Sequence, residues 1–189
     1  MPTAADLRLL AEYNAWMNQR LYQAASLPAA QASAPRGAFF GSLLGTLNHI
    51  AVGDILWLKR FAAHSARYTA LDPVRALPTP AGLDCLLYPD LTGLAALRRE
   101  LDQAIIGWAA QVTDADLGQV LSYTSSRGVA ARRELGGVAL HFFNHQTHHR
   151  GQATTLLSQA GIDMGATDLL LRVPDQPGAP PPTASEYSA

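Results

Sequence analysis

Apolar residues recur at helical spacing in four long stretches of the chain, and polar residues fill the positions between them. The pattern is clearest in residues 91–112, where one face carries Leu94, Leu97, Leu101, Ile105 and Trp108. These positions fall on one side of a helix that turns about every 3.6 residues. Residues 3–26, 39–63 and 135–160 show the same periodicity. The pattern therefore predicts an all-α fold, with the four helices arranged as a four-helix bundle.

Residues that begin or end helices stand at the limits of these stretches. Thr3 or Asp6 can cap the first predicted helix, and Pro28 follows its end. Gly161 comes directly after the fourth stretch, at the position where glycine commonly ends a helix. The predicted helices therefore have defined boundaries.

The segments that join the predicted helices differ in composition. Residues 68–90 contain Pro73, Pro78, Pro80 and Pro89. A connection of this length in a compact helical protein is usually a crossover or a functional segment, so we expect a long crossover between the second and third helices. Residues 113–116 are expected to start a short helical turn. Residues 119–133 predict a small β-hairpin before the fourth helix, with its turn at residues 125–128.

The end of the chain differs in composition from the rest. Residues 163–172 hold a short apolar segment, but from Pro174 onward the chain is rich in Pro, Ala, Ser and Thr and has no core residues. A segment that buries little apolar surface does not offset the entropy lost on ordering. We therefore expect one domain over residues 1–172 and a disordered, proline-rich tail over residues 173–189.

Charge and composition argue against several classes of function. The formal net charge is −1, and no basic run exceeds two residues, so nucleic acid is not an expected partner. No long uncharged apolar stretch and no signal-peptide pattern is visible, so we expect neither membrane insertion nor secretion. The single cysteine, Cys85, cannot form an internal disulfide, which fits a cytoplasmic protein. Charged residues make up only 15%, which favours association through an apolar face.

Four of the six histidines lie between residues 141 and 149, inside the fourth predicted helix. His145 and His149 are four residues apart, so their side chains point the same way and could chelate one metal ion. Such a pair can also be a partly buried polar pair, or a surface pair that faces solvent. Val138, Phe142 and Phe143 predict that this helix is buried. A neutral imidazole in a core needs partners for both ring nitrogens, and a metal supplies one of them.

A third histidine, His49, lies in the middle of the second predicted helix, among leucines. Gly41, Gly45 and Gly53 fall eight and four residues before it and four residues after it, so bare backbone should flank it on its own face. That row either lets a neighbouring helix come close or leaves room for a ligand. Together with the pair on the fourth helix, His49 would complete three neutral ligands, the donor set of an open, catalytic type of metal site.

Other residues of the fourth helix have roles that the pattern leaves open. His148 could replace His149 as a ligand at i+3 spacing, support the site or face solvent, although i+4 is the commoner chelating spacing. His141 could support the site, line a pocket or pack in the core. Gln152 lies on the same helical stripe as the predicted ligands. Gln146 stands where a zinc protease of the His-Glu-x-x-His type has its glutamate base, so that mechanism of peptide hydrolysis is not expected.

No acid, base or nucleophile is tied to the histidines by spacing. Asp54 and Glu12 are candidates for a general base, and Arg150 could bind an anionic group or the helix end. Cys85 is not expected to be a nucleophile, because no basic neighbour or helix N-terminus activates it.

Three separate segments resemble one known family, the DinB family. Residues 144–152, which read Asn-His-Gln-Thr-His-His-Arg-Gly-Gln, are similar to its His-x-x-x-His-Arg-Gly-Gln signature. Residues 45–50 resemble its other conserved stretch, which has a histidine midway along the second helix. The first helix is also similar, through Tyr13, Asn14, Trp16, Asn18 and Leu21. The resemblance extends from about residue 8 to residue 172, and the segments agree in order and spacing.

The resemblance implies a four-helix bundle with a long crossover that commonly pairs into homodimers. It also implies a divalent metal, often zinc or nickel, held by three histidines, which by motif position are His49, His145 and His149. Related members are transferases and isomerases that use low-molecular-weight thiols such as bacillithiol, mycothiol or glutathione. The family name refers to induction by DNA damage and implies no contact with DNA.

Two main hypotheses about function follow, in different classes. The first is a metal-dependent enzyme acting on a small molecule, as a thiol transferase or a hydrolase, in which the metal lowers the pKa of a bound thiol or water. The second is a non-catalytic metal-binding protein of the stress response, in which the metal stabilises the bundle by joining the second helix to the fourth. A dimeric stress-response protein with a vestigial site is a third hypothesis.

Overall fold

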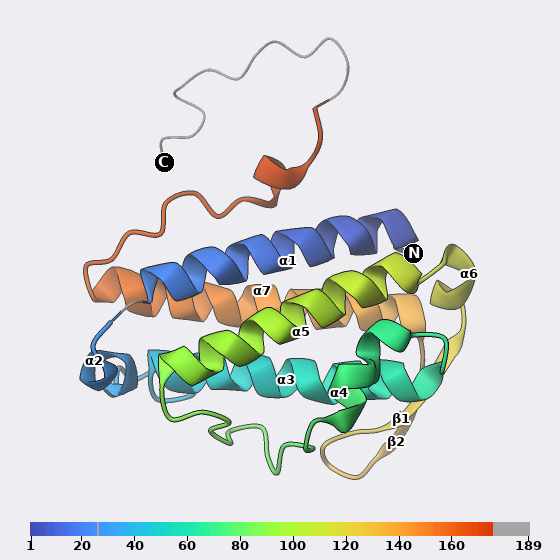
Figure 1. Cartoon of the computed structure of the whole chain (residues 1–189), viewed down its shortest axis with the longest axis horizontal. Coiled ribbons are helices and arrows are strands. Elements are labelled where there is room, and N and C mark those ends of the chain that lie inside the picture. The colour runs from blue at the N-terminus through green and yellow to red at the C-terminus, as the bar shows by residue number, and fades with distance from the viewer. Residues whose placement is uncertain (26, 176–189) are drawn as a thin grey trace.

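Four long helices dominate the computed structural model of the chain, which describes residues 1–25 and 27–175. They are α1 (Ala4–Ala24), α3 (Leu43–His64), α5 (Leu91–Gln111) and α7 (Leu135–Gln159). α1 packs against α5 and α7, and α3 packs against α7 and α5 (Figure 1). All four correspond to the helices predicted from the periodicity of apolar residues. The prediction of a mainly helical fold is therefore confirmed.

Short elements occupy the connections. They are α2 (Ala29–Ser33), the 3-10 helix η1 (Thr69–Leu71), α4 (Asp72–Ala76), α6 (Asp114–Leu117) and the 3-10 helix η2 (Leu169–Arg172). β1 (Val120–Thr124) and β2 (Ala130–Glu134) form an antiparallel hairpin, in which Val120 lies opposite Glu134. The predicted hairpin and the predicted turn near residue 113 are both present. The described part of the chain is thus mainly helical with one small sheet, so the fold is not purely α as predicted.

The start of α3 differs from the prediction, which placed it at Phe39. The Ser42 hydroxyl accepts a hydrogen bond from the Gly45 N–H at 3.0 Å and caps the helix, which begins at Leu43. Gly41 has a φ of +76°, which a right-handed helix does not allow. Residues 39–41 therefore form a turn, and Gly41 does not share a helical face with His49, contrary to the prediction.

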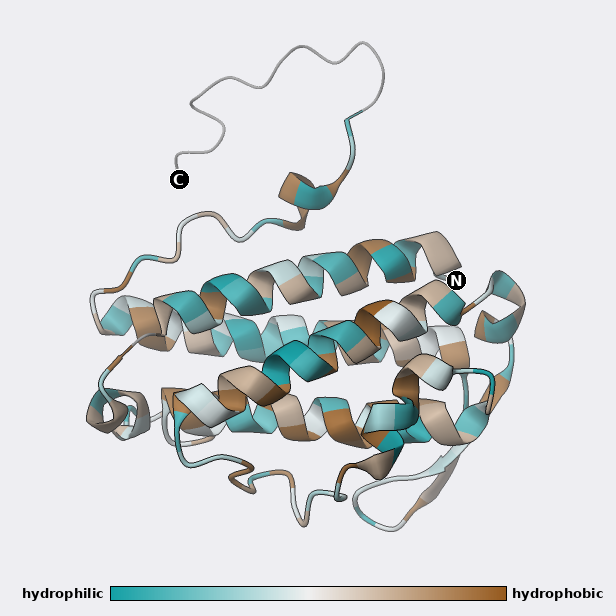
Figure 2. Cartoon of the chain, in the orientation of Figure 1, coloured by the Kyte–Doolittle hydropathy of each residue, from teal (hydrophilic) through white to brown (hydrophobic). Residues whose placement is uncertain are grey.

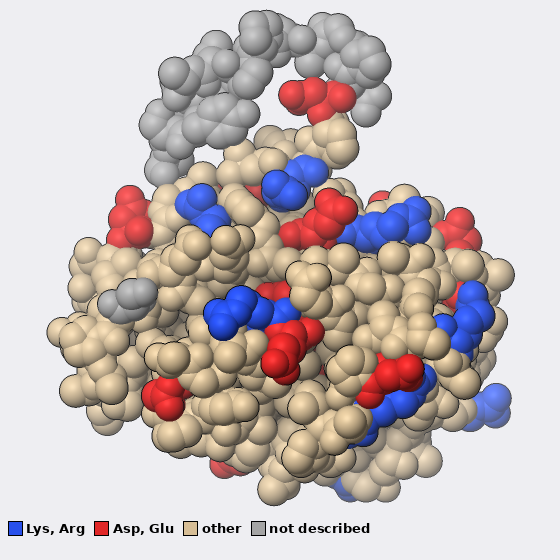
Figure 3. Space-filling view, in the orientation of Figure 1, with Lys and Arg blue, Asp and Glu red and all other residues tan. Residues whose placement is uncertain are grey.

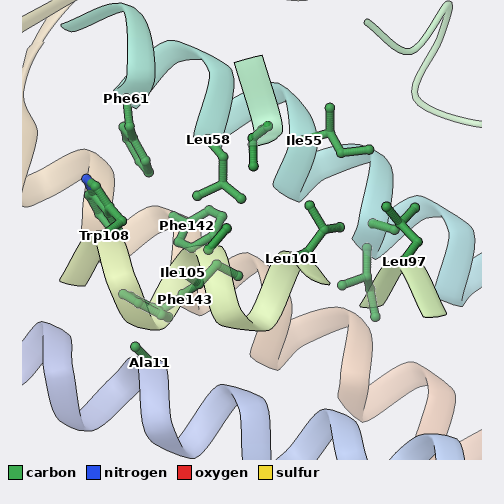
Figure 4. Packing of buried hydrophobic residues seen from close by; sticks show 14 of the residues in the cluster. Ala11, Ile55, Leu58, Phe61, Leu97, Leu101, Ile105, Trp108, Phe142 and Phe143 are labelled. Atoms are coloured by element: carbon green, nitrogen blue, oxygen red, sulfur yellow. The ribbon is translucent and has the colours of Figure 1, made fainter. Parts of the chain in front are cut away.

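The apolar stripes of the long helices meet in one core. The Phe61 ring of α3 stacks on Trp108 of α5, with ring centroids 4.5 Å apart, and meets Phe142 of α7 edge to face (Figure 4). All five apolar residues predicted for the face of α5 are buried. Along each long helix, hydrophobic and hydrophilic residues alternate around the axis (Figure 2). Leu140 of α7 lies outside this core and is 44% exposed.

The surface of the described residues has two features that bear on partners. On the face shown in Figure 3, basic and acidic residues are interspersed and separated by uncharged surface. None of the helices in residues 1–25 and 27–175 combines the length and the hydropathy that a membrane span requires. Most of the predicted tail, residues 176–189, lies outside the described residues.

Candidate metal centre

His49 of α3 meets His145 and His149 of α7 where the two helices pack together. The Nε2 atom of His49 lies 3.2 Å from the Nε2 atom of His145 and 3.2 Å from that of His149. One ring nitrogen from each residue lies within 4.8 Å of the other two, so the three residues could hold a metal ion. His49 is only 5% exposed. The structure thus brings together the three residues that sequence analysis selected as ligands.

Hydrogen bonds fix the protonation of two of these rings. The Nδ1 atom of His49 lies 2.7 Å from the Leu83 carbonyl oxygen, which can only accept, so Nδ1 carries the proton. The Nδ1 atom of His149 donates in the same way to Oε1 of Gln152, at 2.8 Å. A neutral imidazole with its proton on Nδ1 presents a lone pair on Nε2. Both Nε2 atoms are therefore in the state that binds a metal.

The arrangement of the Nε2 atoms fits a bound cation. Lone pairs that face one another at 3.2 Å repel unless a positive charge lies between them. Two nitrogens bound to one ion at about 2.0 to 2.1 Å lie about 2.8 to 3.4 Å apart, for angles of about 90 to 110°. The two separations that start from Nε2 of His49, both 3.2 Å, fall within this range. Three neutral nitrogen donors suit zinc or a similar divalent metal and leave coordination positions for another ligand.

Burial keeps the three imidazoles neutral. Desolvation is the main cause that lowers the pKa of His49, His145 and His149. For His145, desolvation acts together with the positive charge that the neighbouring histidines would carry, and the pKa falls to about 3. Protons therefore compete weakly with a metal at these nitrogens near neutral pH.

Two glycines of α3 make room for the rings. A Cβ atom on Gly53 would lie 2.8 Å from Cε1 of His145, and one on Gly45 would lie 2.1 Å from the Phe40 carbonyl oxygen. The close approach at Gly45 lets the Phe40 ring stack on His49, with centroids 3.7 Å apart and planes 15° apart. The predicted close approach of a neighbouring helix therefore applies at Gly53, whereas at Gly45 the close neighbour is the turn that precedes α3.

The connection between α3 and α5 is fixed to α3 beside the histidines. The Asn48 side chain accepts hydrogen bonds from the N–H groups of Leu87 and Tyr88, at 2.8 and 3.1 Å, and donates to the Tyr88 carbonyl at 3.1 Å. These bonds hold the segment whose Leu83 carbonyl orients His49. Sequence analysis did not find this role. The signal was a polar residue next to His49 on a helix that is otherwise apolar there.

The other histidines of the cluster are not part of the triad. His148 is exposed, and its Nε2 atom lies 3.3 Å from Nε2 of Gln152. His141 is exposed and meets the Trp57 ring at a centroid distance of 5.3 Å. Its ring centroid lies 6.1 Å from that of His145, so it is a neighbour of the triad. Of the three candidates, Gln152 hydrogen-bonds to a ring of the triad, whereas His148 meets the His149 ring edge to face, with centroids 4.7 Å apart.

A buried polar network lies next to the triad and joins all four long helices. Asp54 of α3 accepts hydrogen bonds from Arg98 of α5 and from Gln146 of α7, the latter at 2.6 Å. Arg98 also pairs with Asp102, at 3.0 Å. The network continues through Asn14 and Asn18 of α1, which donate to Asp102, and Arg150 of α7 donates to Asn14. Gly53 and Asp54 are adjacent in the chain, as are His145 and Gln146. The same segments of α3 and α7 therefore position both the network and the triad.

The structure changes the interpretation of three candidate residues. Asp54 is fully buried and occupied by two donors, so it is not available as a general base. Arg150 is buried and directed toward α1, and does not reach outward to bind an anion. Glu12 is exposed on α1, between α1 and α5. Within the described residues, the group of potential ligands around the triad contains no carboxylate.

The fold and the site define a mainly helical protein with three histidines, from two helices, that could hold a metal ion. The chain matches the sequence model of the DinB family over residues 1–178 and therefore belongs to that family. It is 25% identical over 161 residues to Protein DinB of Bacillus subtilis (strain 168), and the alignment covers 84% of this chain and 88% of that protein. No solved structure matches the chain significantly.

Proposed function

We propose that His49, His145 and His149 bind a divalent metal, zinc or nickel, and that the protein is a metal-dependent enzyme acting on a small molecule. The observation that carries the proposal is the convergence of three Nε2 atoms, two of which are fixed as lone-pair donors. Three protein ligands leave positions on the ion for a substrate, which is the arrangement of catalytic sites.

The proposed class of reaction follows from the chemical groups at the triad, which offers metal ligands and, among the described residues, no carboxylate that could act as an acid or base. A bound divalent metal lowers the pKa of a thiol or water and so provides a nucleophile at neutral pH. The Leu83 carbonyl and Gln152 keep two ligating rings oriented, and Phe40 covers one face of His49. No carboxylate in the described residues joins the triad. We therefore favour transfer of a low-molecular-weight thiol, which needs no protein base once the thiol is ionised.

We further propose the larger-scale properties that go with this function. The four long helices form a four-helix bundle, with residues 65–90 as its crossover, and residues 1–172 form one domain. The protein acts in the cytoplasm as a homodimer, without nucleic acid or membrane as a partner.

A structural role for the metal is the second candidate. It is favoured by the burial of His49 and by the position of the triad, which would connect α3 to α7 through the ion. On this alternative, removing the metal lowers the free energy of unfolding, and a thiol does not reach the ion.

Metal analysis of single variants tests the site. We expect His49→Ala, His145→Ala and His149→Ala to lose stoichiometric metal, and His148→Ala and His141→Ala to retain it. Undiminished metal in both His49→Ala and His145→Ala would contradict the three-histidine site. Addition of a cellular thiol to the cobalt-substituted protein should then produce a thiolate-to-metal absorption band, and its absence with every such thiol would favour the structural alternative.

A further inference from the structure

A basic cavity lies along α3, beyond the histidines. It has a volume of about 790 Å³ and is bounded by α3, by residues 79–83 of the connection and by residues 122–127 of the hairpin. In Figure 1 the connection and the hairpin lie along the same side of α3. Its lining includes Lys59, Arg60 and Arg127, together with several Ser and Thr residues, and among the described residues it contains no Asp or Glu.

The three cations have no carboxylate partner among the described residues. The ion pairs there involve Arg67, Arg75 and Arg98, and none of the cations that line the cavity. The Arg60 guanidinium donates to the Thr124 carbonyl at 3.1 Å and lies over the Trp57 ring, 4.4 Å from its centroid. Partial burial lowers the pKa of Arg60 from its usual value, because the cation is desolvated without a compensating charge. An anion in the cavity would supply that charge.

We propose that this cavity binds the carboxylate or phosphate end of a small molecule. Its volume lies within the range of about 300 to 1,000 Å³ that is usual for small-molecule sites. Arginine is suited to such groups, since its planar guanidinium can donate two parallel hydrogen bonds to a carboxylate or a phosphate. A polyanion such as nucleic acid would need a longer basic surface, whereas the chain carries a net charge of −1.

The cavity is placed to serve the histidine site, a step that rests on the proposed function. Leu83 lines the cavity, and its carbonyl is the group that accepts from His49. On α3, Leu56 comes 7 residues after His49, and Arg60 comes 11 residues after it. At about 1.5 Å per residue they lie about 10 and about 17 Å further along the helix axis. The substrate that fits is an elongated molecule, with an anionic end in the cavity and its reacting group at the metal.

Anion titrations of the protein as isolated test the cavity without relying on the metal. Inorganic phosphate and succinate are added separately at low ionic strength, and amide shifts are followed by NMR. We expect shifts in residues 56–63, 79–83 and 122–127, and about tenfold weaker binding in Arg60→Gln and in Arg127→Gln. Arg132→Gln is the matched control, because it removes the same charge from the same hairpin but does not line the cavity. The tighter of the two anions identifies the favoured chemistry.

Three results would overturn the anion site: no binding of either anion, shifts located elsewhere, or equal weakening in Arg132→Gln. Arg127 is exposed in the hairpin, so its variant remains informative if Arg60→Gln fails to fold.

A second experiment tests whether the cavity and the metal bind the same molecule: the cobalt-substituted protein is titrated with glutathione and with its diester. Arg60→Gln should weaken glutathione about tenfold and leave the diester unchanged. Equal effects on both would break the link, whereas failure to bind any metal would reject the proposed function and leave the anion site standing.

Discussion

A Cβ atom built on Gly53 of α3 would lie 2.8 Å from Cε1 of His145 on α7, closer than real Cβ contacts allow. The absence of a side chain at position 53 thus sets how close the two helices come at the triad. The same approach brings Nε2 of His145 to within 3.2 Å of Nε2 of His49. One methyl group would force the imidazole or the helix to move.

The first prediction is that Gly53→Ala weakens metal binding while the protein still folds. Alanine favours a helix over glycine by about 1 kcal/mol, which offsets part of the strain. The displaced imidazole should lower metal affinity by about tenfold or more, measured by competition with a chelator. Gly137→Ala in α7 is the control, since a Cβ there meets nothing within 4 Å, and it should keep its metal and gain stability. Equal metal affinity in both variants would show that Gly53 does not position His145.

Gln152 supports the second prediction, through its effect on the His149 proton. Its Oε1 atom accepts from Nδ1 of His149 at 2.8 Å and so leaves Nε2 free to bind a metal. Gln152→Leu keeps the approximate size but removes the acceptor. We expect metal affinity to fall about 10- to 100-fold, with little change in the free energy of unfolding of the metal-free protein.

The control for Gln152 is His148→Ala. It removes the other side chain that Gln152 contacts but leaves the bond to His149 intact, so it should bind metal as the wild type does. A larger loss of affinity in His148→Ala than in Gln152→Leu would instead point to His148 as a ligand.

Local periodicity was sufficient to predict the long helices and the chelating pair. His145 and His149 share a face on any α-helix, whatever the rest of the fold, and the five apolar residues of α5 are buried as their spacing predicts. Placing His49 opposite the pair required a tertiary contact, which its apolar surroundings, the nearby glycines and the family resemblance of residues 45–50 indicated.

The remaining parts of the site depend on contacts that spacing does not encode. Phe40 reaches His49 because the Ser42 cap starts α3 late, and residues before a cap have no helical face to predict. The Leu83 carbonyl is a backbone group, which carries no residue-specific signal. Arg150 was a candidate for binding an anionic group or the helix end, but its position on α7 turns it toward α1.

The last prediction concerns Asp54, which is a structural residue in this protein and not a general base. Asp54 is 0% exposed and accepts from Arg98 and Gln146. The buried network contains two carboxylates, Asp54 and Asp102, and two guanidinium groups, Arg98 and Arg150. Loss of one carboxylate leaves an uncompensated cation in the core. Asp54→Ala should therefore lower the free energy of unfolding by about 3 to 5 kcal/mol in urea denaturation.

Two comparisons separate this role from catalysis. Asp72 forms an ion pair with Arg75 near the surface, where the Asp72 side chain is 62% exposed and that of Arg75 is 32% exposed. Asp72→Ala should therefore lower the free energy of unfolding by at most about 1 kcal/mol. The double variant Asp54→Leu with Arg98→Met removes one charge of each sign and leaves one buried carboxylate, Asp102, with one buried cation, Arg150. It should therefore recover part of the stability lost in Asp54→Ala. A general base would behave differently, since Asp54→Asn would then abolish activity at unchanged stability. We expect Asp54→Asn to be destabilised instead and, once folded, to retain its metal, because the hydrogen bonds of Asp54 go to Arg98 and Gln146 and to none of the three histidines.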